Sequence, residues 1–260
     1  MGEGLLMTRL LLLDATNLGH RLFHARDASS PLPERFGFAL NRWRKHVQPE
    51  YAVAIFDGPG QGWRSKLWPA YKARRDTDPS SRPGATDWVQ IQIMCRANGI
   101  AVACREETEA DDLIASYTAA AVRQGLDVRI VTSDKDLLQL VRDEPTVHVI
   151  DPGSGAARSS SHVRDDVGVG PPAIPDLLAL AGDPTDGYPG VRGIGRKTAA
   201  VLIEQHGDVE QIIDRAQLLP GKHRDRVLAQ VDDLRLFRRL ATLVDELALP
   251  VPLKLARWER

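Results

Sequence analysis

Residues 9–18 read RLLLLDATNL, an unbroken run of leucines that ends at an acidic residue, Asp14. An apolar run bounded by polar residues is typical of a strand in a protein core. A strand that ends in a carboxylate places this group at the carboxyl edge of a parallel sheet, where open α/β sheets form their sites. The stretch therefore predicts an α/β fold with a polar site at one edge of the sheet.

Acidic residues recur in the same position further along the chain. The apolar runs at 52–56, 128–133 and 177–181 each lead into acids, and another acidic cluster opens a helix-like stretch near 109. Together the clustered acids are Asp14, Asp57, Glu109, Asp111, Asp112, Asp134, Asp136, Asp183 and Asp186. So many carboxylates cannot crowd together without cations, and hard oxygen ligands suit Mg²⁺ or Mn²⁺. The acids predict a metal-dependent enzyme that acts on phosphates.

The pattern of apolar runs and turn residues predicts five strands and a helical second half. The strands are expected at 9–13, 51–56, 101–103, 127–132 and 146–150, with helices at 17–26, 33–47, 86–97 and 109–124. Alternating strands and helices imply right-handed βαβ units, and so a mostly parallel central sheet with flanking helices. A Gly/Ser-rich loop is expected at 152–161, and residues 171–247 are helical in character. The expected division is an α/β core at 1–165 and a helical region at 166–260.

Composition excludes several classes of protein. No segment approaches the ~20 apolar residues of a membrane span, and Cys95 and Cys104 lack zinc-site spacing, which favours a cytoplasmic chain with reduced thiols. The net charge of −1 at first argues against a nucleic-acid partner. However, nine of the 35 Asp and Glu residues belong to the clusters, which leaves 26 against 34 Lys and Arg residues. An acidic centre in a basic surround fits an enzyme that grips and cuts a phosphate backbone.

The segment Glu109-Ala110-Asp111-Asp112 is the sharpest single acidic motif. On a helix, Glu109 and Asp112 are neighbours at i and i+3, so they share one face while Asp111 points aside. Acids are common in the first turn of any helix because of the helix dipole, with Thr108 as the expected cap. The four other acidic clusters favour a functional role over capping alone.

Residues 63–82 interleave basic and aromatic side chains. They include Trp63, Arg64, Lys66, Trp68, Tyr71, Lys72, Arg74, Arg75 and Arg82. Such a segment offers charge for phosphates and flat faces for unstacked bases, although a basic run is usually just a solvated surface. Because it directly follows Asp57, we expect it to overhang the acidic site, with Arg64, Lys66, Tyr71 and Arg74 as DNA contacts.

The segment GVRGIGRKTA at 190–199 places a glycine-rich turn directly before a helix. Backbone N–H groups at a helix N-terminus form a ready phosphate site, but the lysine spacing is not that of a P-loop. The pattern fits a hairpin between two helices that grips a DNA backbone, and a tight helix–helix turn is the competing interpretation. The expected DNA contacts are Gly193, Gly195, Arg196, Lys197 and Thr198.

These motifs, in this order, resemble the 5′-nuclease family, which includes flap endonucleases and the 5′→3′ exonuclease domain of bacterial DNA polymerase I. The resemblance spans about 9–250 and rests on LDATNL at 13–18, FDG at 56–58, YKARR at 71–75, EADD at 109–112, TSDKD at 132–136, DPTD at 183–186 and GIGRKT at 193–198. It implies a PIN-like core, a helical arch at about 60–98 that clamps a free 5′ end, and a C-terminal helix-hairpin-helix. Because no polymerase follows residue 260, the chain resembles the stand-alone bacterial paralogues. The expected state is a monomer.

The resemblance also implies roles for individual residues. Asp14, Asp57, Glu109, Asp111 and Asp112 would surround one metal ion, and Asp134, Asp136, Asp183 and Asp186 a second. Lys72 and Arg75 match the catalytic basic residues of the arch, whereas Arg74 replaces a glycine that is usual there. Backbone carbonyls of Val191, Gly193 and Ile194 match positions that bind K⁺.

The function implied is a structure-specific 5′ nuclease that cuts branched or 5′-flap DNA near a single-strand/duplex junction in replication and repair, by a two-metal mechanism. One alternative is a PIN-like ribonuclease, against which the helix-hairpin-helix favours duplex DNA. A second is a branched-DNA binding protein with little turnover, against which the intact set of acids stands.

Overall fold

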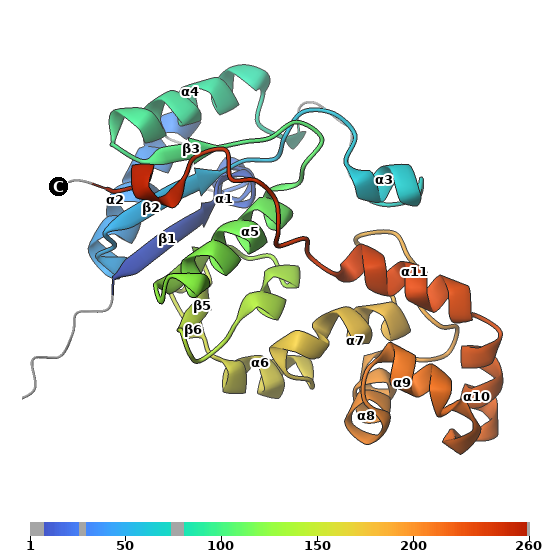
Figure 1. The fold of residues 1–260 in the computed structure, drawn as a ribbon. Helices are drawn as coiled ribbons and strands as arrows, with labels where there is room; N and C mark the ends of the chain where they lie inside the picture. The colour runs from blue at the N-terminus through green and yellow to red at the C-terminus, as the bar shows by residue number, and fades with distance from the viewer. Residues whose placement is uncertain (1–7, 26–29, 74–80, 259–260) are drawn as a thin grey trace, which may run out of the picture.

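The computed structural model describes residues 8–25, 30–73 and 81–258. Its centre is a six-stranded sheet in the order β3-β2-β1-β4-β5-β6 (Figure 1). The strands are β1 (Arg9–Asp14), β2 (Tyr51–Ile55), β3 (Ala101–Ala103), β4 (Asp127–Val131), β5 (Val147–Ile150) and β6 (Ala157–Arg158). The first five strands are parallel, and β6 runs antiparallel to β5. The predicted mostly parallel sheet is confirmed, whereas β6, inside the expected loop at 152–161, was missed.

Helices follow the strands in the expected alternation. Those of the first half are α1 (Ala15–Phe23), α2 (Leu32–Val47), α3 (Trp63–Leu67), α4 (Ala85–Ala97), α5 (Ala110–Arg123) and the 3₁₀ helix η2 (Asp136–Leu140). Those of the second half are α6 (Ser160–Val167), η3 (Pro171–Ala173), α7 (Ile174–Ala181), α8 (Arg196–His206), α9 (Val209–Asp214), η4 (Ala216–Leu218), α10 (Gly221–Leu228), α11 (Val231–Ala241) and η5 (Leu253–Leu255). None of these helices is both long and apolar enough to cross a membrane, within the described residues.

The central strand β1 is buried on both faces, because its leucines alternate between two cores. Leu11 and Leu13 pack with side chains of α1, α2 and α4 on one face of the sheet. Leu10 and Leu12 pack with α5 on the other face. All four leucines are fully enclosed. This two-sided burial explains why the strand is an unbroken apolar run.

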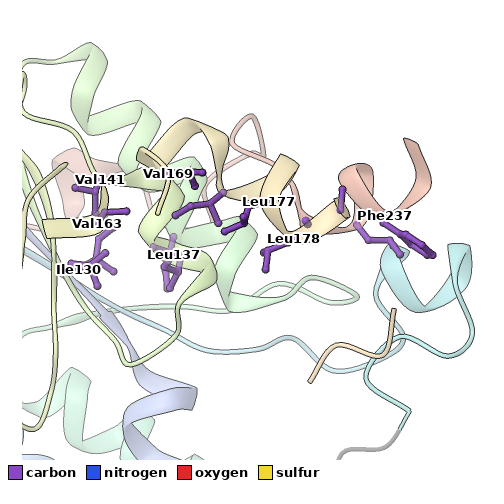
Figure 2. Close-up of a cluster of buried hydrophobic side chains, with 14 of the residues drawn as sticks. Ile130, Leu137, Val141, Val163, Val169, Leu177, Leu178 and Phe237 are labelled. Atoms are coloured by element: carbon purple, nitrogen blue, oxygen red, sulfur yellow. The ribbon is translucent and has the colours of Figure 1, made fainter. Parts of the chain in front are cut away.

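The helical second half shares the core of the α5 face. A continuous buried cluster runs from Ile130 of β4 through Leu137, Val163 and Leu177 to Phe237 of α11 (Figure 2). Because a close-packed interior deforms little, this cluster fixes the position of the helical region relative to the sheet edge.

Residues after α11 return to the sheet, as the red end of the ribbon shows (Figure 1). The Tyr117 hydroxyl of α5 donates to the Val251 carbonyl at 2.7 Å and accepts from the Val251 N–H at 3.1 Å. The Trp258 N–H then donates to the Glu50 carbonyl at 2.8 Å, just before β2. We call residues 242–258 the C-terminal strap.

Part of the segment expected to form an arch, 60–98, belongs to the layer of helices on the sheet. Residues 85–97 form α4, which packs against α2 and β3 and buries Ile91 and Cys95 in the sheet core. The helix therefore belongs to the layer that covers the sheet. Within the described part of 60–98, α3 and the turn that follows it stand away from the sheet (Figure 1), and Arg74 and Arg75 lie outside the described residues.

Candidate active site

The acidic site lies where the order of the strands reverses. From β1 the chain continues to β2 on one side, and β4 flanks β1 on the other, so the carboxyl ends of β1 and β4 border the switch point of the sheet. Asp14 at the end of β1 caps α1 by accepting from the Asn17 N–H at 3.0 Å. Its other oxygen accepts from the Thr132 hydroxyl at the end of β4, at 2.7 Å. The topology therefore joins the first acidic motif to the fourth.

Asp57 and Asp111 complete the group around Asp14. Asp57, two residues after the end of β2, accepts from the Ala110 N–H at the start of α5 at 2.8 Å, which fixes the next residue, Asp111, at the same edge. Burial, with repulsion from Asp57 and Asp134, raises the pKa of Asp14 to about 7. Burial and repulsion from Asp134 likewise raise the pKa of Asp111 well above its usual value. These carboxylates lie close enough to disfavour one another's charge.

A second group joins residues of both halves of the chain. The Asp183 side chain accepts from the N–H groups of Thr185 and Asp186 at 2.7 and 3.3 Å, which closes the turn after α7. Burial, followed by repulsion from Asp134, Asp186 and Asp183, raises the pKa of Asp136 to about 8. Asp134 thus repels members of both groups.

Lys72 bridges the two groups of acids. Its ammonium lies 2.5 Å from a Glu109 oxygen and 4.0 Å from both Asp111 and Asp186. Its backbone N–H donates to the Asp186 carbonyl at 2.9 Å, and its φ of 53° is in the left-handed region. The backbone contact with the turn after α7 holds this lysine over the acids.

Two members of the EADD motif, Glu109 and Asp112, contact a buried arginine, and Glu109 also contacts Lys72 among the other acids. Arg64 of α3 is 2% exposed, and its guanidinium donates to both oxygens of Asp112 at 2.7 Å and to Glu109 at 2.7 Å. Asp112 also accepts from the Trp63 indole and from the Val244 N–H. Glu109 and Asp112 therefore share a face, as expected, and both contact Arg64 on it. Asp111 is the residue of the motif that lies with Asp14 and Asp57.

This arrangement bears on two expected roles. Asp112, expected as a metal ligand, has both oxygens committed to protein donors, and Arg64, expected as a DNA contact, is enclosed. Arg64 also donates to the carbonyls of Leu240 and Thr242 at 2.8 and 3.0 Å. It therefore joins α3, α5 and the end of α11. The run of basic residues in the sequence gave no sign of this, because the partners lie 45 or more positions away.

Asp112→Ala is expected to lower the free energy of unfolding by about 3–5 kcal/mol, because it leaves the Arg64 charge buried without its main partner. The matched control is Asp111→Ala, one residue away, where loss of a mutually repelling carboxylate should leave stability in metal-free buffer unchanged or slightly raised. Urea unfolding of both variants measures the difference. Equal destabilisation of the two would contradict the separation of their roles.

The remaining residues of the 63–73 segment are divided between interior and surface. Tyr71, expected as a DNA contact, is 6% exposed, and its hydroxyl donates to Glu109 at 3.3 Å. Lys66 is exposed and pairs with Glu107 at 2.6 Å.

Two further polar residues, for which the sequence suggested no role, also build the site. The Thr16 hydroxyl accepts from the Asp57 N–H, and the Asn17 side chain accepts from Ser133. Their place directly after Asp14, in the first motif, could have indicated this.

The donor set fits hard divalent cations. The cavity over the first group has a volume of about 550 Å³ and is lined by oxygen donors that include Asp14, Asp57, Asp111 and Asp134. No three acidic, His or Cys side chains within the described ranges converge closely enough to hold an ion alone. Mg²⁺ commonly keeps several waters and takes one or two carboxylates, so this spacing suits it. The buried Tyr188 hydroxyl, which has no hydrogen-bond partner among the described residues, can donate to such a water near Asp136.

The glycine-rich hairpin presents its basic residues outward. Gly195 caps α8, and Arg196 and Lys197 in the first turn are exposed, with Thr198 half-buried. The Ile194 N–H donates to the Val191 carbonyl at 2.9 Å, which closes the turn. A side chain built at Gly195 would meet nothing within 4 Å. The N–H groups at the start of α8 are therefore open to a ligand.

Comparison with known proteins gives matches over the whole described length. The family model of the 5′-3′ exonuclease N-terminal resolvase-like domain matches residues 9–168. The family model of the 5′-3′ exonuclease C-terminal SAM fold matches residues 169–260. The flap endonuclease Xni of Edwardsiella ictaluri is 34% identical over 242 residues, 92% of this chain and 93% of that protein.

Other relatives are longer or more distant. DNA polymerase I of Rhizobium leguminosarum is 35% identical over 260 residues, and the match covers 94% of this chain but 25% of the polymerase. The chain thus spans about a quarter of the length of the polymerases it matches. A structure of T5 5′-exonuclease with bound zinc superposes with a TM-score of 0.78 at 23% identity, over 91% of this chain and 90% of that one. That superposition establishes the same fold.

Proposed function

Because this chain belongs to the 5′-3′ exonuclease family, we propose that it is a metal-dependent 5′ nuclease that hydrolyses phosphodiesters near junctions of single-stranded and duplex DNA. The family membership confirms the resemblance inferred from the motifs. The observation that carries the proposal is the meeting of two groups of carboxylates at one sheet edge, with Lys72 between them.

Two metal sites of hard oxygen ligands would share this edge. Asp14, Asp57, Asp111 and Glu109 would serve the first, and Asp134, Asp136, Asp183 and Asp186 the second, with Mg²⁺ or Mn²⁺ as the ion. Bound ions of this kind supply activated water and neutralise charge on the transferred phosphate. Asp14 and Asp134 hold their positions through Thr132, whose hydroxyl contacts both. Lys72 would then place its ammonium on a non-bridging phosphate oxygen, where it stabilises the developing charge.

The hairpin would hold the duplex by its backbone. Arg196 and Lys197 are exposed beside the free N–H groups of α8, which suits phosphate contacts that do not read sequence. The carbonyls of Val191, Gly193 and Ile194 are the proposed K⁺ ligands. The Arg226 guanidinium donates to the Gly193 carbonyl at 3.4 Å, so a K⁺ ion would displace it. The proposed location is the cytoplasm, which suits the two free thiols of Cys95 and Cys104, and the proposed state is a monomer.

Cleavage of a labelled 5′-flap DNA tests the function. With Mg²⁺ or Mn²⁺ the protein should release the flap at or near the junction, and EDTA should abolish release. Blunt duplex DNA and an RNA of the same sequence are the controls. Preference for the RNA would identify a PIN-like ribonuclease, and tight flap binding without cleavage in either metal would identify a binding protein.

Gly195→Val is expected to weaken duplex binding at least tenfold, about 1.4 kcal/mol. The added side chain faces open space in the free protein, so only a bound phosphate would meet it. Fluorescence anisotropy with a 5′-flap duplex measures the affinity, and cleavage of a short single-stranded 5′ end, which needs little duplex grip, should change much less.

The control for the hairpin is a pair of lysine variants. Lys197→Ala should reduce the salt dependence of duplex binding by about one phosphate contact, whereas Lys45→Ala on α2 should leave it unchanged. If Gly195→Val binds the duplex as the parent does, the hairpin is only a structural turn.

A further inference from the structure

A second cavity, of about 590 Å³, opens beside the acidic site. It shares Thr16, His20, Asp57 and Arg82 with the cavity that holds the carboxylates. The two hollows are therefore neighbours with a common wall at Asp57. A nucleotide whose phosphate reaches the carboxylates has this second cavity within reach of its base.

The walls of this cavity are aromatic and come from three elements. The Trp88 ring of α4 lies 5.5 Å from the His20 ring of α1 and 6.2 Å from the Phe56 ring after β2, as measured between ring centroids. A Cβ at Gly19 would lie 2.5 Å from the Trp88 ring, so a glycine is needed there for the indole to lie against α1. The indole is thus held at the cavity by packing, and aromatic faces fixed in this way suit stacking with a planar ligand.

Polar groups stand at the rim. Arg82 is exposed and lines both cavities, and Gln92 lines the aromatic one. A guanidinium at the common rim can contact the phosphate between two nucleotides, and an amide side chain can hydrogen-bond the edge of a base. The metal chemistry of the carboxylates uses none of Trp88, Arg82 or Gln92.

We propose that this aromatic cavity is a nucleobase subsite, which takes the base of a nucleotide adjacent to the scissile phosphate. The inference rests on the proposed function, since the acidic site must hold that phosphate. Stacking is tolerant of sequence because every base has a flat face, so the subsite adds affinity without choosing a base. It would favour an unpaired nucleotide, because a paired base is not free to enter.

The test couples a change in the protein to a change in the DNA. Flap substrates carry either a normal base or an abasic nucleotide on one or the other side of the scissile phosphate. For the parent, one of the two abasic positions should lower the single-turnover rate at sub-saturating enzyme about tenfold, as expected for loss of one stacked base. In Trp88→Leu this penalty should shrink to less than twofold, and Trp88→Phe should restore most of it.

The matched control is Phe38→Leu, which removes an aromatic ring that is 70% exposed on α2 and does not line the cavity. It should keep the full abasic penalty. An equal penalty in the parent and in Trp88→Leu, or no penalty at either position in the parent, would overturn the subsite.

A measurement on the parent alone covers the case in which Trp88→Leu does not fold. With 2-aminopurine at the sensitive position, metal-free binding of the flap DNA should quench its fluorescence by stacking. Unchanged or increased fluorescence on binding would overturn the proposal. Failure of the parent to cut any flap DNA would instead contradict the proposed nuclease, so the two failures are distinct.

Discussion

Asp134→Ala is expected to lower the rate of flap cleavage by roughly 10³-fold or more, about 4 kcal/mol of transition-state stabilisation, and to leave flap binding within about threefold of the parent. Asp134 repels members of both groups of acids, so its loss would alter both proposed metal sites at once. The duplex grip lies elsewhere, in the hairpin before α8. Single-turnover cleavage and metal-free anisotropy titration measure the two effects separately.

The control for this variant is Asp143→Ala, an exposed aspartate between η2 and β5, which should leave both rate and affinity unchanged. Removal of the Asp134 charge also relieves repulsion on Asp14, Asp111 and Asp136, so the variant should unfold no more easily than the parent in metal-free buffer. Parallel losses of binding and cleavage would show that Asp134 holds the fold or the DNA and not the catalytic ions.

Lys72→Ala is expected to lower the rate at saturating substrate by roughly 10²–10³-fold, with a change in affinity below about threefold. The lysine lies among Glu109, Asp111 and Asp186, where the proposed function places the scissile phosphate. Its charge would therefore act mainly on the transition state. The comparison is Lys66→Ala, a neighbouring lysine that is exposed and paired with Glu107, for which rate and affinity should stay near those of the parent.

Cleavage rates of Lys72→Ala measured over a full range of substrate concentrations distinguish the possible roles of Lys72. A variant that binds weakly but reaches the parent rate at saturation would make Lys72 an ordinary backbone contact. A variant as slow as Asp134→Ala but also unstable would indicate that the contact of Lys72 with Glu109 supports the fold.

The sheet could be predicted because its strands carry strong local signals. Four leucines before Asp14 and the β-branched runs of β2 and β4 leave few alternatives. The short strand β6 and the five-residue α3 were missed because two to five residues carry too little periodicity. The cap of α5 was predicted one residue too early. Glu109 is the cap, and the Thr108 hydroxyl bonds the Glu106 carbonyl instead.

The sequence predicted an acidic site, but it could not predict which of its acids contact Arg64 and which lie together at the sheet edge. The helical spacing of Glu109 and Asp112 correctly gave them a common face, yet the sequence could not tell which group that face meets. The answer depends on Arg64, 45 positions away from Glu109, and on the return of the chain at Leu240. A buried arginine and a DNA-binding arginine look the same in a basic run. Only the tertiary fold separates them.

The C-terminal strap brings the two ends of the described chain to one place. The Arg9 N–H at the start of β1 donates to the Glu50 side chain at 2.6 Å, and the Trp258 N–H donates to the Glu50 carbonyl at 2.8 Å. This place is at the amino ends of the parallel strands, on the opposite side of the sheet from the carboxylates. A fluorophore, bead or surface linker attached near either end would thus lie on the side of the molecule opposite the carboxylates. Single-molecule tethering can use both ends together and leave the substrate side facing the solution.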